Sequence, residues 1–390
     1  MTHTSIPTVR RRVTTLLLLG ALVFISASIS PAAQPSARKP LASGDIEDIA
    51  TLVLLEDTRR FDDEALKRIM GSAHPEVRRR AVQAIGRIAD PRGHALLVTA
   101  RGDADPEIVA TVAFAAGQLK DEESTAWLSE QLSSPRTAPA IAREAARSLG
   151  KIRSTEARAA LAKYLSSAPA TSAPAPVVGE ALLSMGRFTT RDNLAPIVRW
   201  ATSPDVEVRW RAAWALFRPR DPAAVPHLLE LSKDKSAEVR YWAVRGLAPV
   251  PPPAGRGNTA QPLPDDWANI DKAPLSARLR EATRDPDRRV RTEALRALAQ
   301  YDDDESFGIV SEALESPDSW VSVSAAEGLA RYGKRADVTV PKLVTASGTG
   351  KPLGLRMTAL ASLVTLRPEA ALDPASALIR ESSVAARTAA

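Results

Sequence analysis

The fold is decided by the segment Asp205-Val206-Glu207-Val208-Arg209-Trp210-Arg211-Ala212-Ala213-Trp214-Ala215-Leu216, because its pattern recurs along most of the chain. Its apolar residues stand at relative positions 0, 4, 5 and 8, counted from Val208 as the origin. This spacing places them on one stripe of an α-helix and does not fit the alternation of a strand. The segment therefore predicts an amphipathic helix that buries one face.

The same pattern is found nine times. The origin falls at Val77, Ile108, Ile141, Val177, Val208, Val239, Val290, Val321 and Leu355. Successive origins are 31 to 36 residues apart, except for one gap of 51 residues between Val239 and Val290. Four positions after the origin, eight of the nine residues are Ala, and the ninth is Val112. A small residue at a fixed place predicts that neighbouring helices approach closely, and a fixed period of this length indicates a repeat architecture.

A second helix precedes each repeated helix. Asp or Ser three residues before the origin is typical of a helix N-cap, as at Asp105, Asp205, Ser236, Asp287 and Asp318, and His74 takes this place in the first copy. The preceding helices are expected at 95–100, 125–132, 157–165, 224–231, 307–314 and 338–345. Each unit is then a helical hairpin of about 31 residues that cannot bury its apolar face alone, so the units are expected to stack into a solenoid. A compact helical bundle is the competing arrangement.

The runs Asp205-Val206-Glu207-Val208-Arg209 and Ala212-Ala213-Trp214-Ala215-Leu216 resemble HEAT repeats, in particular the short bacterial kind called phycobilisome-lyase-like repeats. The resemblance covers roughly residues 45–390. It implies an all-α, right-handed α-solenoid of about nine to ten stacked hairpins. It also implies a structural role for the arginines that follow the origin, each paired with an acidic residue of an adjacent turn or unit; these are Arg78, Arg209, Arg240, Arg291 and Arg356.

The sequence divides into five predicted parts. Residues 1–33 read as a secretory signal peptide, 34–44 as a flexible linker, 45–248 as a first block of repeats, 249–272 as a Pro-rich insertion loop, and 273–390 as a second block of repeats. The chain ends at Ala390 inside what resembles another inner helix, so we expect the last repeat to be incomplete and the sequence to be a fragment of a longer protein.

The N-terminal segment has the order of an export signal. Three arginines at 10–12 precede an apolar run at 13–25, and small residues follow. The apolar run is short for a membrane span, which needs about 20 residues. We expect cleavage between Ser26 and Gln34 and location in a bacterial periplasm or outside the cell, with an uncleaved inner-membrane anchor as the minority alternative.

The composition argues against several kinds of chemistry. The 390 residues contain no Cys, which excludes disulfides, thiolate catalysis and Cys-ligated metals. The four His residues are too far apart in sequence for a helical metal pair, and His94 and His227 are expected to be ordinary surface residues without a partner. No nucleophile elbow, zinc-protease motif, Walker loop or dinucleotide fingerprint is present. We therefore assign no catalytic residue, no metal ligand and no cofactor.

Nucleic acid is not an expected partner. The net charge is +6, and Arg10, Arg11 and Arg12 are the only charged residues of 1–33, so removing that segment leaves +3. A nearly balanced chain lacks the strongly basic character that phosphate binding normally requires.

One cluster of residues is a candidate site. Trp210, Trp214, Tyr241 and Trp242 fall in two successive inner helices, with Arg211 and Arg245 near them. Trp210 and Tyr241 both stand two positions after the origin, off the buried stripe, where they are expected to face the concave surface. Aromatic residues with Arg are typical of binding hot spots. The alternative is that these rings pack beneath the Pro-rich insertion.

Three functional hypotheses follow. The first is a non-catalytic exported scaffold that binds a protein or peptide on its concave face, with self-association through an uncapped terminal repeat as a further expectation. The second rests on the segment 54–62, which resembles the start of exported bacterial proteins in which HEAT repeats precede a cyclophilin-type peptidyl-prolyl isomerase domain. That resemblance implies an isomerase domain beyond residue 390. The third, a bilin-lyase-like or nucleic-acid-binding protein, is disfavoured by the export signal.

Overall fold

The computed structural model describes residues 40–188, 190–191, 194–248, 267 and 269–380. The chain divides into two units, Met1–Leu41 and Ala42–Ala390, and every helix listed below lies in the second. The regular elements in these described ranges are α-helices and short 3₁₀ turns, with no strand among them. The prediction of an all-α array of stacked hairpins is confirmed, whereas the hand of its superhelix stays a prediction.

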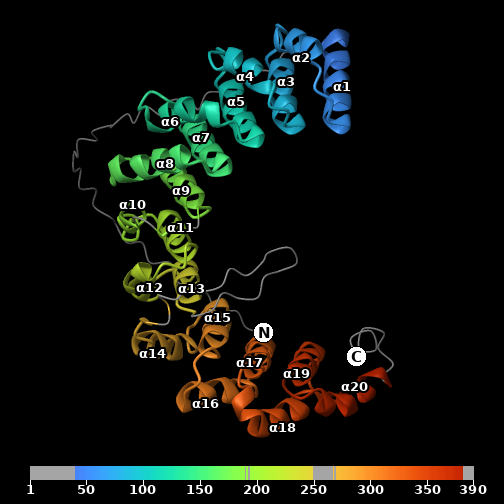
Figure 1. Cartoon of the computed structure of the whole chain (residues 1–390), viewed down its shortest axis with the longest axis vertical. Helices are drawn as coiled ribbons and strands as arrows, with labels where there is room; N and C mark the ends of the chain where they lie inside the picture. The colour runs from blue at the N-terminus through green and yellow to red at the C-terminus, as the bar shows by residue number, and fades with distance from the viewer. Residues whose placement is uncertain (1–39, 189, 192–193, 249–266, 268, 381–390) are drawn as a thin grey trace, which may run out of the picture. The chain divides into compact units, whose positions relative to one another are not determined.

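Two layers of helices run along the second unit (Figure 1). The odd-numbered helices form the inner layer: α1 (Ser43–Thr58), α3 (Pro75–Ile88), α5 (Pro106–Leu119), α7 (Pro139–Ile152), α9 (Ala175–Met185), α11 (Val206–Phe217), α13 (Ala237–Gly246), α15 (Arg288–Leu298), α17 (Ser319–Leu329) and α19 (Leu353–Leu366). The outer layer consists of α2 (Asp63–Met70), α4 (Gly93–Ala100), α6 (Thr125–Ser133), α8 (Thr155–Ser167), α10 (Ala195–Val198), α12 (Val225–Leu231), α14 (Ala273–Ala282), α16 (Asp304–Ala313) and α18 (Ala336–Ala346). A short helix, α20 (Leu372–Ile379), follows α19.

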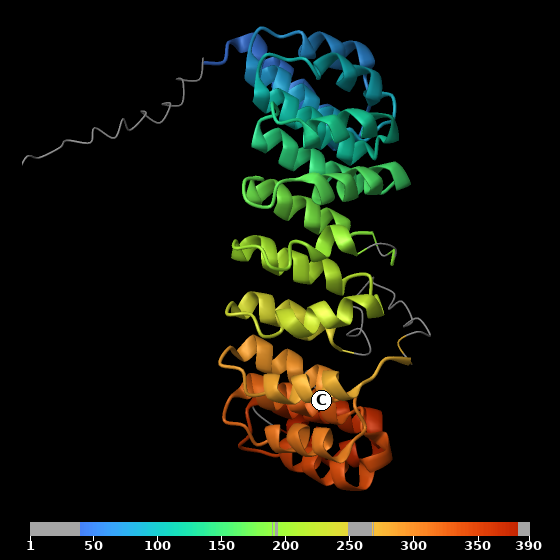
Figure 2. The same cartoon turned by 90° about the vertical axis from the view of Figure 1, so that its left-hand side faces the viewer.

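Each inner helix packs against the inner helix before it and the one after it, from α1 to α19. Figure 2 shows the resulting succession of rungs from the blue to the red end of the array. The contact between α13 and α15 belongs to this series although the Pro-rich insertion separates them in sequence. The two predicted blocks of repeats are therefore joined by the same type of helix–helix contact as every other pair.

The predicted apolar stripe is the core of the array. The residues at positions 0, 4, 5 and 8 of all nine copies are buried, and none is more than 8% exposed. All of them except Ile141 form one continuous cluster with outer-helix residues such as Leu97, Leu128 and Leu161, which are fully buried. Burial of each such Leu stabilises the fold by about 1.5–3 kcal/mol. The stack as a whole, and not the single hairpin, thus provides the core.

The predicted N-caps are confirmed at the Asp positions. Asp105, Asp205, Asp287 and Asp318 each accept a hydrogen bond from a free backbone N–H in the first turn of their helix. His74 also caps, because its Nδ1 accepts from the N–H of Glu76 at 3.2 Å. Ser236 differs: it is the N-cap residue of α13 but makes no side-chain capping bond.

Gly residues at the C-terminal ends of the inner helices set how closely the rungs approach. A Cβ atom on Gly117 would lie 2.4 Å from Oγ of Ser148, and a Cβ on Gly150 would lie 2.5 Å from Oγ of Ser184. Gly86 meets Ala115 in the same way, at 2.7 Å from its Cα. In each case the Gly stands nine positions after the origin of its repeat, and the residue that it contacts stands seven positions after the origin of the next repeat. Because no real Cβ fits at these distances, the helix spacing depends on Gly there.

Two helix ends bear on the predicted linker and insertion. Helix α1 begins at Ser43, so the last two residues of the predicted linker are helical. Helix α14 begins at Ala273, directly after the predicted insertion, but Trp267 inside that insertion is buried at 5% exposure. The predicted signal peptide, residues 249–266 and the final segment 381–390 lie outside the described residues.

In the described part of the chain, no helix has the length and apolar character needed to cross a bilayer.

Candidate partner-binding face

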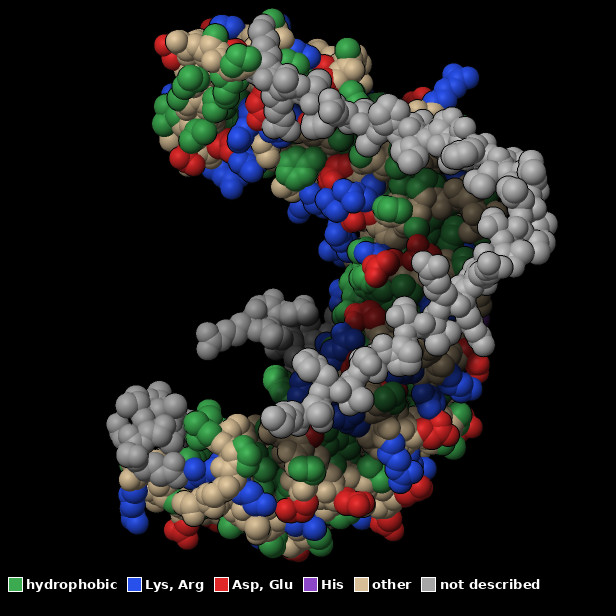
Figure 3. Space-filling view, turned by 180° about the vertical axis from the view of Figure 1, so that it is seen from behind, with side chains coloured by type: hydrophobic (Ala, Val, Ile, Leu, Met, Phe, Trp, Pro, Cys, Tyr) green, Lys and Arg blue, Asp and Glu red, His purple; other side chains and the backbone are tan. Residues whose placement is uncertain are grey.

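The inner helices present one side to the outer helices and the opposite side outward. We call this outward side the inner-helix face, and Figure 3 shows Lys and Arg side chains gathered along it. The predicted aromatic cluster lies on α11 and α13, which pack against each other. Its rings, Trp210, Trp214, Tyr241 and Trp242, are all partly buried, because each rests against the core while keeping part of its surface accessible.

On α11, one carboxylate holds both an aromatic ring and a cation in place. Oε2 of Glu207 accepts from Nε1 of Trp210 at 3.0 Å and from Nη1 of Arg211 at 2.7 Å. The guanidinium of Arg211 lies over the Trp210 ring, 4.3 Å from its centroid. The hydrogen bonds from Trp210 and Arg211 lower the pKa of Glu207. The indole and the guanidinium are thus fixed in one stacked arrangement before any partner arrives.

The α13 half of the cluster is built in a similar way. Nε1 of Trp242 donates to Oε1 of Glu238 at 2.9 Å, and the Trp242 ring lies edge-on to Tyr241 with centroids 5.0 Å apart. Nη1 of Arg245 donates to the hydroxyl of Tyr241 at 2.8 Å. From α15, Arg289 pairs with Glu238 at 2.6 Å. The cluster is therefore wider than predicted, since sequence reasoning missed both Glu residues and Arg289.

Trp214 has a different role from Trp210. A Cβ on Gly186 would lie 2.3 Å from Cζ3 of Trp214, so the ring fits against the end of α9 only because Gly186 has no side chain. Gly179 makes room for the Arg211 stem in the same way, with Cδ 2.8 Å from where its Cβ would be. Of the predicted site residues, Trp214 and Arg211 thus also join α9 to α11.

One contact made by the described residues concerns the alternative that the aromatic rings pack beneath the Pro-rich insertion. Nε1 of Trp267 donates to the carbonyl oxygen of Arg220 at 2.6 Å, just beyond the end of α11. The guanidinium of Arg220 lies 4.7 Å from the centroid of Phe217, and Phe217 stacks on Trp242 at 6.2 Å. The C-terminal end of the insertion therefore reaches the edge of the cluster. The rest of the insertion lies outside the described residues.

The structural arginines form a ladder at the N-terminal ends of the inner helices, which is the end of these helices opposite to Arg220 and Trp267. Three of the five make a two-point pair with an Asp of the following unit: Arg78 with Asp103, Arg209 with Asp234, and Arg240 with Asp285, at 2.7–3.1 Å. Arg291 pairs with Asp318 at 3.0 Å. The geometry agrees with the predicted structural role at these four positions. Arg356 is also buried, and its Nε donates to the carbonyl oxygen of Ser347 at 3.3 Å.

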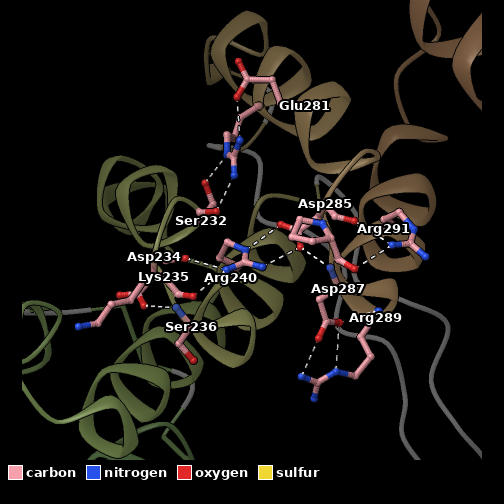
Figure 4. Close-up of polar contacts among 12 residues, drawn as sticks. Ser232, Asp234, Lys235, Ser236, Arg240, Glu281, Asp285, Asp287, Arg289 and Arg291 are labelled. Atoms are coloured by element: carbon pink, nitrogen blue, oxygen red, sulfur yellow. Dashed lines mark hydrogen bonds and ion pairs between the residues drawn. The ribbon is translucent and has the colours of Figure 1, made fainter.

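Figure 4 shows why this ladder is continuous across the insertion. Arg240 donates to the carbonyl oxygen of Asp234 at 2.9 Å and to both carboxylate oxygens of Asp285, 45 residues away. Asp285 also accepts from the N–H of Asp287, and its carbonyl oxygen accepts from Arg291. Each Asp therefore ties the Arg of one unit to the helix start of the next. The long insertion leaves this connection intact.

At the C-terminal edge, sequence reasoning missed a second set of arginines. Four of them donate to carbonyl oxygens in or just after a neighbouring inner helix: Arg59 to Arg87, Arg187 to Arg147, Arg218 to Gly186, and Arg220 to Ala248. The bonds to Arg87, Gly186 and Ala248 satisfy carbonyls that the helix itself leaves open, whereas Arg147 lies inside α7. A basic residue recurring ten to twelve positions after the origin was the available signal, but the prediction used only the helix start.

One histidine prediction is wrong. His94 was expected to have no partner, yet its Nδ1 lies 2.7 Å from Oδ2 of Asp121, and its Nε2 lies 3.4 Å from Glu123. The pair links α4 to the start of the next outer helix. Sequence reasoning missed it because the two residues are 27 positions apart and belong to successive units. The described residues contain no group of three or more potential metal ligands.

Comparison with known proteins agrees with this architecture. The family model for HEAT repeats matches residues 63–139, 95–171, 167–248 and 275–364. No curated protein sequence matches the chain. Among solved structures, Kap95p in complex with RanGDP is 14% identical with a TM-score of 0.57, covering 87% of this chain and 53% of that one. Kap121p bound to Pho4p is 12% identical with a TM-score of 0.50, covering 90% and 44%.

YibA of Escherichia coli covers 85% of this chain and 99% of its own at 15% identity, with a TM-score of 0.42. At these identities the structural likeness concerns the fold alone. The family model, however, spans well over half of the residues, and the matched segments coincide with the stacked hairpins. The chain belongs to the HEAT-repeat family.

Proposed function

We propose that this protein is a non-catalytic scaffold that binds a protein or peptide partner on its inner-helix face. The aromatic–arginine cluster on α11 and α13, made of Trp210, Arg211, Trp214, Tyr241, Trp242 and Arg245, is the proposed anchor. The observation that carries this proposal is the fixed arrangement of rings that remain partly accessible. Trp210 is held by Glu207 and Arg211, and Tyr241 by Arg245 and Trp242. A surface ordered in advance loses less side-chain entropy on binding.

HEAT-repeat neighbours support the same type of function. The solved structures of Kap95p and Kap121p are complexes with the proteins RanGDP and Pho4p, respectively. Their likeness to this chain concerns the fold, so it supports protein binding as a class and identifies no partner.

The proposal is tested by removing the accessible rings. We expect Trp210→Ala combined with Tyr241→Ala to abolish co-purification of the partner from extracts of the native source, quantified by mass spectrometry. The melting temperature should fall less than for the loss of a fully buried ring, because both rings are only partly buried. Glu230→Ala combined with Glu315→Ala is the matched control, since both side chains are exposed and lie on the outer side. Loss of stability without loss of any partner would contradict the proposal and favour a packing role.

We further propose that the protein is exported. The support is the order of charged, apolar and small residues in 1–33. Intact mass measurement of the protein from its native source should show a chain beginning between Ser26 and Gln34. A mass that includes Met1 would contradict cleavage and favour the anchored alternative.

The isomerase alternative rests on the segment 54–62 alone. In the structure this segment completes α1 and leads into α2, and Leu55 within it is fully buried. Arg59 adopts a left-handed conformation at the end of α1 and contacts the carbonyl oxygen of Arg87. The segment thus has a sufficient structural role, and the scaffold function does not depend on an isomerase domain.

A further inference from the structure

A row of cations that form no direct ion pair lies beside the aromatic cluster. We define the basic edge as Lys151, Arg153, Arg187, Arg218 and Arg220, which stand at or just after the C-terminal ends of α7, α9 and α11. No carboxylate of the described residues lies within ion-pair distance of any of the five, although most other arginines of the array form such pairs. The basic edge is therefore a local excess of positive charge on a nearly balanced chain.

The structure holds these cations in place without neutralising them. Arg187 donates to the carbonyl oxygen of Arg147 and Arg218 to that of Gly186, each at 3.4 Å. The Arg218 guanidinium lies 5.5 Å from the Trp214 ring, and the Lys151 ammonium lies 4.8 Å from the Phe114 ring. Contacts with carbonyls and ring faces orient a cation but leave its charge uncompensated, so N–H groups remain available to an anion.

Neighbouring positive charges act on two of these arginines. Burial, and then the charges of Arg153 and Arg245, lower the pKa of Arg218. Burial and the charges of Arg245 and Arg218 lower the pKa of Arg220 to about 10, although Glu293 acts in the opposite direction. An anion placed among these groups would relieve that repulsion. The available N–H groups and the repulsion between the cations thus both favour an anionic ligand.

Arg153 and Arg220 adopt left-handed conformations, with φ of 64° and 54°, at the ends of their inner helices. Ala89 and Lys120 adopt the same conformation after α3 and α5, so this backbone geometry is a feature of the repeat and positions the two arginines in the same way.

We propose that the basic edge binds an acidic peptide segment of the partner, rich in Asp and Glu, which extends across the ends of α7, α9 and α11 next to the aromatic cluster. This proposal rests on the proposed function, because it assigns a chemical class to the partner of the same face. The carboxylates of the segment would pair with Arg153, Arg187 and Arg218, while an adjoining apolar residue contacts Trp210. Glu144 and Glu180 act on Lys151, so the carboxylates of the segment are assigned to the other cations of the basic edge. A peptide supplies both carboxylates for these cations and an apolar side chain for the neighbouring rings, which a polyphosphate does not.

The test is a direct binding measurement with the full chain. A fluorescein-labelled 12-residue peptide of alternating Glu and Asp with one central Tyr is titrated with the protein at 0.15 M salt, and anisotropy is recorded. The combined variant Arg153→Glu, Arg187→Glu and Arg218→Glu should weaken binding by about 30-fold or more. The control variant Arg136→Glu, Lys163→Glu and Lys342→Glu changes net charge by the same amount at exposed positions away from the basic edge and should bind normally.

A second variant keeps the test valid if charge reversal disturbs folding. Arg153→Gln, Arg187→Gln and Arg218→Gln retain hydrogen-bonding capacity, and this variant should weaken binding by about 10-fold with an unchanged circular dichroism spectrum. An oligo-dT of equal charge and anionic phosphatidylserine vesicles are titrated in parallel. Tighter binding of either than of the peptide would overturn the proposal, and so would equal losses in the basic-edge and control variants.

The outcome separates this inference from the proposed function. If the peptide fails to bind wild-type protein at millimolar concentration while Trp210→Ala with Tyr241→Ala still loses its native partner, the scaffold function stands and the acidic class is wrong. If the peptide binds and the charge variants lose both peptide and partner, the two proposals are supported together.

Discussion

The ion pair between Arg240 and Asp285 connects the two blocks of repeats that the Pro-rich insertion separates in sequence. Asp285 accepts from Nε and Nη2 of Arg240 at 2.7 and 2.8 Å and from the N–H of Asp287 at 2.8 Å. The side chains are only 12% and 6% exposed. Replacing Asp285 with Ala removes two charge-assisted bonds and leaves a largely buried guanidinium, and each such bond contributes about 1.5–3 kcal/mol. We expect a loss of about 3 kcal/mol in the free energy of unfolding.

The assay is urea unfolding followed by circular dichroism and Trp fluorescence in a double-mutant cycle of Arg240→Ala and Asp285→Ala. The coupling energy should be about 2 kcal/mol. The two probes should also separate in the variants, because weakening one interface of a repeat array lets its two sides unfold independently.

The matched control is the exposed pair Lys351–Glu315, with side chains 35% and 64% exposed, for which the coupling should stay below about 0.5 kcal/mol. A coupling for Arg240–Asp285 no larger than that of the control would refute the ladder as a stabilising connection.

Three further predictions concern the packing and the pH dependence of the array. Gly150→Ala should destabilise by about 2 kcal/mol, because its Cβ would meet Ser184 at 2.5 Å, whereas Gly308→Ala, with open space around it, should stabilise slightly; equal effects in thermal melts would contradict the close approach. Hydrogen bonds from Arg78 lower the pKa of Asp103 below its ordinary 3.8, so the contribution of this carboxylate to stability is present above that value and is lost as pH falls through the lower folded-state pKa. Asp103→Asn should therefore cost stability at pH 7, and the difference from wild type in urea unfolding should shrink steadily as pH falls below 3.8; a difference that does not depend on pH would contradict the ionised pair. Burial raises the pKa of Glu293 above 4.5 despite the nearby charges of Arg245 and Arg296, so the ionised form of this side chain is disfavoured in the folded protein. Glu293→Gln should therefore raise the melting temperature at pH 8 but not at pH 4. A lower melting temperature at pH 8 would show that the attraction of the arginines outweighs burial.

The repeat architecture was predictable because it depends on local chemistry. The spacing of Val208, Ala212, Ala213 and Leu216 specifies a helix and its buried face, and Asp205 specifies its start, so each unit is defined within about 31 residues. Repetition then fixes the fold, since every hairpin must cover the stripe of the next.

The connections between units were less accessible to sequence reasoning. The pairing of His94 with Asp121 and the bond from Trp267 to Arg220 join residues 27 and 47 positions apart, and no local pattern specifies them. The Arg–Asp ladder was expected only through resemblance to HEAT repeats, which gave the arginines without their partners. Geometry was needed to show that Asp285 replaces a nearer Asp across the insertion.

The candidate site was predicted in part. Trp210 and Tyr241 could be placed off the buried stripe by counting positions, and both remain partly accessible. The roles of Trp214 and Arg211 against Gly186 and Gly179 could not be foreseen, because they depend on side chains missing from the neighbouring helix. The basic edge was also missed, since its members belong to successive units and acquire meaning only when α7, α9 and α11 are stacked.

The most direct test of the central claim is site-specific photo-crosslinking in the native source. A photoreactive phenylalanine analogue is placed at position 210 on the inner-helix face, and in a parallel strain at position 230 on the outer layer, where Glu230 is 76% exposed. The account predicts a discrete crosslinked partner from position 210, reduced by Arg153→Gln, Arg187→Gln and Arg218→Gln, and none from position 230. Crosslinking only from position 230, or to the same partners from both positions, would contradict the assignment of binding to the inner-helix face.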